Sequence, residues 1–207
     1  MPIGAIRPGC HKMAGISTAA RAICKAYMDK PKLGPRQLAY ENPFLRISSV
    51  RVESPEYVKT IYVIDSGPRV GVLLIKDGQV LLVRQYRMLI NDFALEIPGG
   101  AVDPGESPEN AAYRECAEET GLRCLNLKPL LFYHPGLDTN DNPTWMFSCT
   151  EMEPVEHYEP DPHEVTELVW LPFSRCLEMV FEKQIVDCLS VAAILAYQVR
   201  KDCPNVY

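Results

Sequence analysis

The hydrophobic and polar residues of this chain alternate, over several short segments, with the two-residue period of a β-strand. Two such segments, 44–52 and 57–64, are rich in β-branched and aromatic residues. The residues Ser54-Pro55 separate them, so we expect the two segments to pair in an antiparallel meander. Ahead of them, residues 31–35 (PKLGP) contain several residues that break regular structure, and this composition predicts a linker.

A second pair of strands is predicted on either side of an Asp77-Gly78 turn. Residues 70–75 and 80–85 flank this dipeptide, and Asp-Gly is a strong signal for a tight hairpin. Further strands are expected at 93–97, 125–132, 144–150 and 166–171. Two helices should close the chain, at 172–182 and at 187–200, because the apolar residues of the second helix fall on one face.

Between these strands the sequence predicts a short helix that begins near Ser107. Ser107 is a favourable N-cap, and Pro108 fits the first helical position because its missing N–H has no helical partner there. Gly121 is a natural stop, since glycine readily adopts the left-handed conformation that ends many helices. The predicted order of strands and helices is that of an α+β protein.

This helix carries an unusual set of charges. Glu115, Glu118 and Glu119 lie at positions i, i+3 and i+4, so they project from one face. Like charges at this spacing destabilise an isolated helix by roughly 0.2–0.5 kcal/mol. A hard divalent cation would offset the repulsion, since carboxylate oxygens suit Mg²⁺, Mn²⁺ or Ca²⁺.

The composition argues against two classes of partner. The net charge of −6 is unlike that of a general nucleic-acid binder, which needs a basic face, and no apolar run is long enough to cross a bilayer. The eight cysteines show no paired metal-binding spacing, and no secretory signal precedes them. We therefore expect reduced thiols, a cytoplasmic protein, and neither nucleic acid nor membrane as a partner.

The first 28 residues allow two interpretations. They contain four basic residues and no acidic one, a composition that weakly resembles a mitochondrial transit peptide. The plainer interpretation is a surface helix over 14–27 that packs apolar side chains on the rest of the protein.

Residues 100–122, GAVDPGESPENAAYRECAEETGL, match the Nudix box, G-x5-E-x7-R-E-U-x-E-E-x-G-U with U aliphatic, at every fixed position. One aliphatic position is Cys116, which behaves as a small buried hydrophobe. Seven fixed residues of about 6–7% frequency each would match by chance roughly once in 10⁸ windows. The match therefore favours this family over a solvated acidic helix face, and the chain resembles the Nudix hydrolases.

The resemblance implies a fold and a division of the chain. Residues 68–207 are expected to form a Nudix α/β/α sandwich around a mixed sheet. Residues 36–67 would form a small N-terminal antiparallel β subdomain, which similar enzymes use to form a homodimer. Residues 1–35 would supply the N-terminal helix and linker.

The resemblance also implies Mg²⁺ as cofactor, with Mn²⁺ as a substitute, and hydrolysis of a nucleoside diphosphate linked to another moiety. The implied metal ligands are the Gly99 carbonyl, Glu115, Glu118 and Glu119, with Glu118 binding directly or through water. Glu106 and Arg114 would orient these carboxylates, and the alternative for them is an ordinary ion pair.

Two segments outside the box resemble the ADP-ribose pyrophosphatase and nucleotide-sugar branch of the family. The run Arg84-Gln85-Tyr86-Arg87 precedes the box, and its arginines would bind the diphosphate, because the guanidinium fork holds phosphate oxygens bidentately. Pro135-Gly136 matches a substrate-binding loop of that branch. The alternatives are surface arginines beside a strand end and an ordinary turn.

The catalytic base and the base-stacking residues are harder to assign from sequence. In the acidic segment 156–167, Glu164 matches the general base of related enzymes best and Glu167 comes next, while the alternative is a solvated acidic loop. His134 and His163 are weaker candidates. Four aromatic residues could stack a nucleobase, although such residues are more often sheet core: Tyr40, Phe44, Tyr57 and Tyr62.

The sequence as a whole predicts a Mg²⁺-dependent nucleotide-sugar diphosphatase, with ADP-ribose as the favoured substrate and AMP and ribose 5-phosphate as products. Other nucleotide sugars (ADP-glucose, GDP-mannose, UDP-glucose) or a dinucleotide are alternatives. A non-catalytic ADP-ribose sensor is a third, against which the intact box argues. Isomerisation of an isoprenyl diphosphate would need a catalytic cysteine in its own local context, and none is evident.

Overall fold

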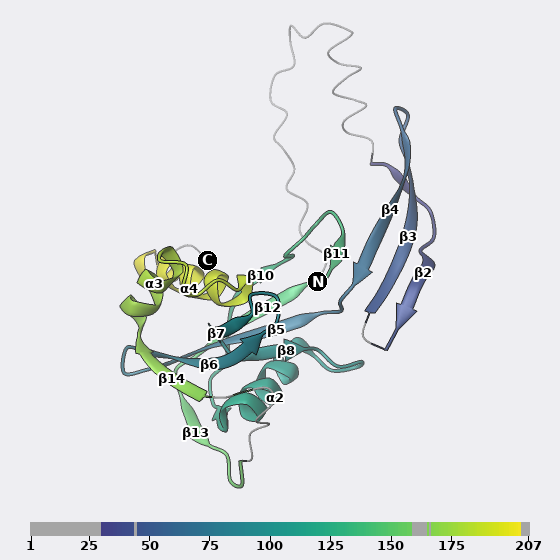
Figure 1. Ribbon diagram of the computed structural model, residues 1–207. Coiled ribbons are helices and arrows are strands. Elements are labelled where there is room, and N and C mark those ends of the chain that lie inside the picture. Colours follow the sequence, from purple (N-terminus) through teal and green to yellow (C-terminus); the bar gives the residue numbers. More distant parts are fainter. Residues whose placement is uncertain (1–29, 44, 159–164, 166, 204–207) are drawn as a thin grey trace, which may run out of the picture.

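A computed structural model of the chain describes residues 30–43, 45–158, 165 and 167–203 (Figure 1). The helix expected at 14–27 and the predicted base Glu164 lie outside these residues. The strands are β1 (Lys32–Leu33), β2 (Gln37–Asn42), β3 (Leu45–Glu53), β4 (Val58–Asp65), β5 (Arg69–Lys76), β6 (Gln79–Arg87), β7 (Asp92–Glu96), β8 (Gly99–Ala101), β9 (Leu122–Cys124), β10 (Lys128–Tyr133), β11 (Asn140–Asp141), β12 (Thr144–Cys149), β13 (Met152–Pro154) and β14 (Glu167–Pro172). The described helices are α2 (Pro108–Thr120), α3 (Phe173–Phe181) and α4 (Cys188–Asp202).

Most of the predicted elements are confirmed, within a few residues of their expected bounds. One strand begins later than expected: β10 starts at Lys128 and not at Leu125. The Asn126 side-chain oxygen accepts hydrogen bonds from the backbone N–H groups of Thr150 and Glu151, both at 3.0 Å. Asn126 thus holds residues 125–127 as a loop instead of a strand.

The central sheet has seven strands in the order β10-β12-β5-β6-β14, with β7 also paired to β6 and β8 to β5. The β12–β5 pair is parallel and the other pairs are antiparallel, so the sheet is mixed, as expected. The hairpin between β5 and β6 turns at Asp77 and Gly78, with φ of 50° and 74°. Both values are positive, as a two-residue type I′ turn requires.

Strands β5 and β6 separate beyond this turn and leave room for the start of the box. They pair only at Ile75–Val80 and Lys76–Gln79. Farther along, β8 pairs with the beginning of β5, where Gly99 lies opposite Gly71, and β7 pairs with the end of β6. A Cβ atom at Gly99 would overlap the backbone of residues 70–71, so only glycine fits this close approach.

Helices cover both faces of the central sheet and form an α/β/α sandwich (Figure 1). Leu73 of β5 points toward α3 and α4, where it packs in a cluster with Ile194. Leu81 of β6 packs in the other cluster with Ala112 of α2. All four side chains are fully buried. The apolar character of β5 and β6 follows from this position, since both faces of these strands are covered.

A second sheet of five strands stands beside the sandwich (Figure 1). Its strands β1, β2, β3 and β4 are antiparallel, and β1 lies within the segment expected to be a linker. Strand β11, which follows the Pro135-Gly136 loop, pairs in parallel with the end of β4. Arg36, which directly precedes β2, forms an ion pair of 2.6 Å with Asp141 of β11. The second sheet therefore holds the chain that leaves the Pro-Gly loop.

Tyr40 of β2, Tyr62 of β4 and Tyr57, which directly precedes β4, are exposed, so the expectation that they form sheet core is wrong. Phe44 lies outside the described residues. Tyr40, Tyr57 and Tyr62 are 51%, 43% and 59% exposed. The reason is that the helices of the α/β/α sandwich cover the central sheet and leave these three side chains at the surface of the described chain.

None of the described helices is long and apolar enough to span a membrane.

Candidate active site

The box helix α2 begins and ends as its sequence predicts. The Ser107 hydroxyl accepts a hydrogen bond from the backbone N–H of Asn110 at 3.2 Å, and Pro108 is the first helical residue. Gly121 ends the helix with a φ of 66° and donates its N–H to the Ala117 carbonyl. These caps fix which side chains of the helix face the Gly99–Gly100 segment.

Arg114 lies among the carboxylates of the box. Its guanidinium donates to Glu106 at 3.0 Å, to Glu115 at 2.9 Å and to Glu118 at 3.0 Å, and it also donates to the Ala101 carbonyl. The Glu106 carboxylate raises the pKa of Arg114, and Arg114 in turn lowers the pKa of Glu106. The box thus contains a cation of its own that offsets part of the repulsion among its glutamates.

The three glutamates of the helix have different surroundings. Glu119 is buried, at 8% exposed, whereas the Glu118 side chain is 59% exposed and turned toward Arg114. The Glu115 carboxylate lies directly against Gly100, so that a Cβ there would overlap it. Glu115 and Glu119 therefore meet the Gly99–Gly100 segment.

Glu119 is held in place by two donors. Its Oε2 atom accepts a hydrogen bond from the Gly99 backbone N–H at 2.9 Å, and its Oε1 atom accepts one from the Gln85 side chain at 2.9 Å. Gln85 is 6% exposed, and sequence reasoning assigned it no role. The strand alternation could have found it, since Gln85 is a polar residue at an inward-facing position of β6.

The two predicted phosphate-binding arginines both have carboxylate partners. Arg87 makes two hydrogen bonds to Glu96, at 2.7 and 2.6 Å, and this pairing raises the pKa of Arg87. Arg84 lies 3.8 Å from the Glu167 carboxylate, and its guanidinium lies 4.0 Å above the ring centroid of Phe93. The predicted run thus lies on β6, and its two arginines are each paired with a carboxylate, Arg84 with Glu167 and Arg87 with Glu96.

A cleft of about 610 Å³ opens beside the box. Its walls include three of the predicted site residues, Arg87, Gly99 and Pro135, whereas Gly136 is not part of its lining. The lining also includes Arg69, which lies in register with Ala101 at the edge of the box. Within the described part of the chain, no side chain forms an ion pair or hydrogen bond with the Arg69 guanidinium.

Sequence reasoning missed Arg69 because it belongs to no motif. It follows Gly67-Pro68 as the first residue of β5. Its relation to the box comes from the pairing of β5 with β8, which joins segments about thirty residues apart. The sequence predicted strand β5 but not its pairing with β8.

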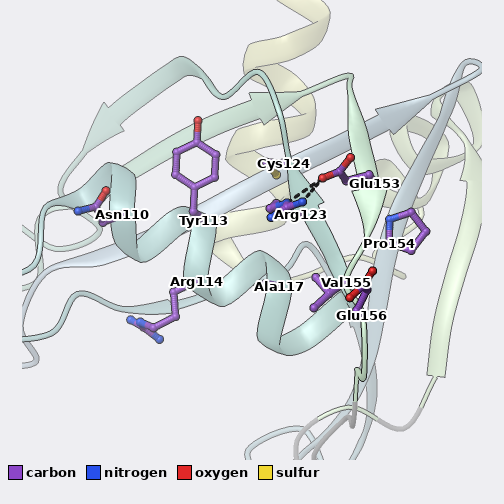
Figure 2. A pocket seen from close by; sticks show the side chains of 10 residues that line it. All are labelled: Asn110, Tyr113, Arg114, Ala117, Arg123, Cys124, Glu153, Pro154, Val155 and Glu156. Carbon is purple, nitrogen blue, oxygen red and sulfur yellow. Dashed lines mark hydrogen bonds and ion pairs between the residues drawn. The ribbon is translucent and has the colours of Figure 1, made fainter.

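A larger hollow of about 1060 Å³ lies along another side of α2 (Figure 2). It is lined by Tyr113 of the helix and by Arg123 and Glu153, which form an ion pair across two short strands. Gly99 and Gly100, the segment against which Glu115 and Glu119 lie, line the smaller cleft and not this hollow. We therefore place the candidate active site in the smaller cleft, where the carboxylates meet the glycine segment.

The described residues contain no group of three or more His, Cys, Asp or Glu side chains arranged to hold a metal. Mg²⁺ does not require one, since it is commonly bound through one or two carboxylates, several waters and the phosphates of a substrate. Glu115 and Glu119 beside the Gly99–Gly100 segment fit that pattern of hard oxygen donors. Glu118 is 59% exposed and is hydrogen-bonded to Arg114 through one of its two oxygens.

Of the two residues predicted as the catalytic base, Glu164 and Glu167, the structure describes only Glu167. Glu164 lies outside the described residues. Glu167 lies on β14 in register with Arg84 and does not line the cleft. The arrangement of the described residues thus favours Glu167 as a partner of Arg84.

The fold and the box together define a class of phosphate-bond hydrolase. A family model of the NUDIX domain matches residues 65–186, more than half of the chain, and the chain therefore belongs to the Nudix family. It is a Nudix hydrolase with the α+β sandwich expected from its sequence. Nudix hydrolases generally use divalent metals.

Several named proteins are similar to this chain. An ADP-ribose pyrophosphatase of Bacillus subtilis is 28% identical over 134 residues, which cover 64% of this chain and 72% of that protein. An ADP-ribose pyrophosphatase of Saccharomyces cerevisiae is 33% identical over 122 residues, 55% of this chain and 51% of the yeast protein. A CMP-5'-(N-acetyl-N-hydroxy-3-aminopropyl)phosphonate hydrolase of Streptomyces rubellomurinus is 28% identical over 165 residues, 77% and 78% of the two chains.

A solved structure has the same fold. The crystal structure of an ADP compounds hydrolase superposes with a TM-score of 0.74 at 18% identity, covering 86% of this chain and 98% of that one. At this identity the match establishes the architecture alone.

Proposed function

We propose that this protein is a Mg²⁺-dependent hydrolase of the diphosphate linkage in nucleoside diphosphate sugars, with ADP-ribose as the favoured substrate. The observation that carries the proposal is the meeting of Glu115 and Glu119 with the Gly99–Gly100 segment at the wall of a cleft. The names of the bacterial and yeast relatives support ADP-ribose as the substrate to test first.

The reaction adds water across the linkage. The water oxygen forms a bond to one phosphorus, the bond from that phosphorus to the bridging oxygen breaks, and the proton of the water is taken up by a base. From ADP-ribose the products are AMP and ribose 5-phosphate. A bound Mg²⁺ or Mn²⁺ would neutralise diphosphate charge and lower the pKa of the attacking water.

The residues of the box would hold this cation and keep its ligands in position. Glu115 and Glu119 would bind it, and the hydrogen bonds from Gln85 and Gly99 keep Glu119 directed toward the glycine segment. Arg114 orients Glu115 by a hydrogen bond of 2.9 Å. Positioning contacts of this kind commonly change metal affinity or activity by about 10- to 100-fold.

Two arginines of the cleft would bind the diphosphate. Arg87 donates two of its five N–H groups to Glu96, so its other N–H groups remain to bind phosphate oxygens. Arg69 supplies a second positive charge at the edge of the box. Glu164, assigned from the family resemblance, stays our candidate for the base.

The second sheet supports a homodimer. Its exposed apolar side chains include Leu38, Tyr40, Val58 and Tyr62, each more than half exposed. Val58, Tyr62 and the partly exposed Ile64 alternate along β4 and so project from one face of the sheet, and an exposed apolar face commonly marks a protein–protein contact. We propose that two copies of the chain associate through this sheet.

The substrate assignment is tested by a panel of nucleotide sugars. The full-length protein is incubated with ADP-ribose, ADP-glucose, GDP-mannose, UDP-glucose or a dinucleotide, in Mg²⁺ or Mn²⁺, with EDTA as the metal-free control. Products are separated and identified by mass, and ¹⁸O-water shows which phosphorus is attacked. We expect AMP and ribose 5-phosphate from ADP-ribose.

Two results would overturn the proposal. If ADP-ribose bound but was never cleaved, the protein would be a sensor. If another member of the panel was the better substrate, the linkage would stand but the favoured sugar or base would be wrong. A CMP-linked phosphonate is added because the Streptomyces relative is named for such a substrate.

A further inference from the structure

Three polar residues in the same cleft have side-chain oxygens that nothing in the described chain satisfies. The atoms are Tyr133 Oη, Asn142 Oδ1 and Asp187 Oδ1, each buried and without a hydrogen-bond partner among the described residues. They come from the end of β10, from the segment before β12 and from the residue that precedes α4. All three residues nevertheless line the cleft that contains Gly99 and Arg87.

Such atoms are rare in folded proteins, because burying a polar group without a partner costs free energy. Asn142 is 9% exposed, so bulk water does not replace the missing bond at low cost. The Cys188 thiol lies beside Tyr133, but a thiol is a weak hydrogen-bond partner. Three unsatisfied oxygens on residues that line one cleft therefore indicate a ligand that supplies the partners.

The local structure fixes these groups in place. Asp187 is the N-cap of α4, and its Oδ2 atom accepts the backbone N–H of Ser190 at 2.8 Å, which leaves Oδ1 for another donor. The Asn142 backbone carbonyl accepts the Thr144 hydroxyl at 3.0 Å. The three residues thus lie at the ends of regular elements, where side chains are held firmly.

The chemistry of these three side chains differs from that of the arginines that line the same cleft. A carboxylate oxygen and an amide oxygen repel an anion and accept hydrogen bonds, and a phenol can donate or accept. A diphosphate therefore suits Arg69 and Arg87, while hydroxyl groups suit Asp187, Asn142 and Tyr133.

We propose that Tyr133, Asn142 and Asp187 form a hydroxyl-binding subsite that recognises the sugar joined to the diphosphate. This inference rests on the proposed function and adds the residues that select the sugar. A substrate whose second moiety lacks hydroxyl groups would leave the three oxygens unsatisfied and bind less well.

The test compares substrates that differ only in this moiety. Variants Tyr133→Phe and Asn142→Leu remove a hydrogen-bonding group at similar volume, and Asp187→Asn keeps an N-cap side chain. For each we expect kcat/KM for ADP-ribose to fall roughly 3- to 10-fold, the scale of one hydrogen bond. The kcat/KM for an ADP alkyl ester, which lacks the hydroxyls, should stay unchanged.

Tyr197→Phe is the matched control, because it makes the same chemical change on α4 outside the cleft. It should leave both substrates unaffected. If the cleft variants lost the same factor on both substrates, or on neither, the subsite would be wrong.

A binding measurement separates this inference from the proposed function. Thermal shift is followed with ribose 5-phosphate and, for comparison, with ethyl phosphate. Stronger stabilisation by ribose 5-phosphate, lost in Tyr133→Phe and Asn142→Leu, would support the subsite even if the protein cleaved no nucleotide sugar. Equal stabilisation by both compounds would overturn it even if ADP-ribose were cleaved.

Discussion

The Glu119 carboxylate accepts a hydrogen bond from the backbone N–H of Gly99 at 2.9 Å. Nineteen residues of chain separate the two, and this bond joins the last turn of α2 to the segment that begins the box. The box is therefore closed on itself by its own residues. The geometry of the candidate metal site depends on this closure as well as on the charge of the glutamates.

Replacing Glu119 by glutamine should abolish most turnover while the protein still folds. The glutamine oxygen can accept from Gly99, and the Gln85 amide can rotate to present its oxygen to the new nitrogen. The variant loses a metal-binding charge, so we expect kcat to fall by about 10²–10³, the scale of losing one preorganised electrostatic contact. Steady-state kinetics on the preferred substrate measure this change.

Glu118→Gln is the companion variant, because Glu118 is exposed and paired with Arg114. A large loss there as well would mean that Glu118 also binds the metal during turnover. Circular dichroism and thermal melting confirm that both variants are folded. Near-full activity of Glu119→Gln on every nucleotide sugar would contradict its metal-binding role.

Gln85 should influence activity only through Glu119. Replacing it with methionine keeps the length of the side chain but removes the donor to Glu119. We expect activity to fall about 10- to 100-fold, and the Mg²⁺ concentration needed for half-maximal rate to rise. A titration of rate against Mg²⁺ tests this, and an unchanged midpoint would show that Gln85 is only part of the core.

The sequence predicted the fold well where local signals agreed with tertiary pairing. Ser107, Pro108 and Gly121 bound the box helix because capping chemistry is local. Short strands such as β8 and β11 were missed. They contain too few residues to show a period, and they form because a partner strand passes beside them.

The candidate site was predictable as far as its motif extends. The box glutamates were named from their spacing and the match to the Nudix box, and Arg87 was named from its resemblance to the arginine run of one branch of the family. Arg87 lines the cleft. Arg69 and Asn142 were not named, since each reaches the cleft through strand pairing and neither stands in a motif. Sequence spacing also gave no sign that Arg84 would lie over Phe93 and near Glu167.

The pair formed by Glu106 and Arg114 predicts a dependence of stability on pH. Hydrogen bonds from Arg114 lower the pKa of Glu106 below its ordinary value of 4.5. A carboxyl group whose pKa is lower in the folded protein than in the unfolded chain increases the free energy of unfolding at pH values above its unfolded-state pKa. This increase is lost as the pH falls through the pKa of the folded state. The melting temperature of the wild type should therefore exceed that of Glu106→Gln at pH 6, and the difference should shrink toward pH 3.

The comparison is made by differential scanning calorimetry without added metal at both pH values. Glu109→Gln is the control, since Glu109 lies in the first turn of the same helix but does not pair with Arg114. If the difference in melting temperature between the wild type and Glu106→Gln stayed constant with pH, protonation of Glu106 would not be coupled to folding.

Gly99→Ala should destabilise the protein, because the added methyl group would overlap the backbone of residues 70–71. Overpacking of this kind costs about 1–3 kcal/mol in free energy of unfolding. Gly34→Ala is the matched control, since a Cβ there meets its nearest atom at an ordinary 3.4 Å. Urea unfolding measures both. Equal stability of the two variants would mean that β5 and β8 can move apart freely.

The exposed face of the second sheet should determine the oligomeric state. Val58 on β4 and Val199 on α4 are both 55% exposed, so they form a matched pair of sites. If two chains associate through the second sheet, Val58→Lys places a charge in the interface and should convert the dimer to a monomer, whereas Val199→Lys should not. Light scattering after size-exclusion chromatography distinguishes the 23.3 kDa monomer from a species of about twice that mass. A wild type that was monomeric at micromolar concentration, or a dimer that survived Val58→Lys and Tyr62→Lys together, would show that this face does not hold two copies together.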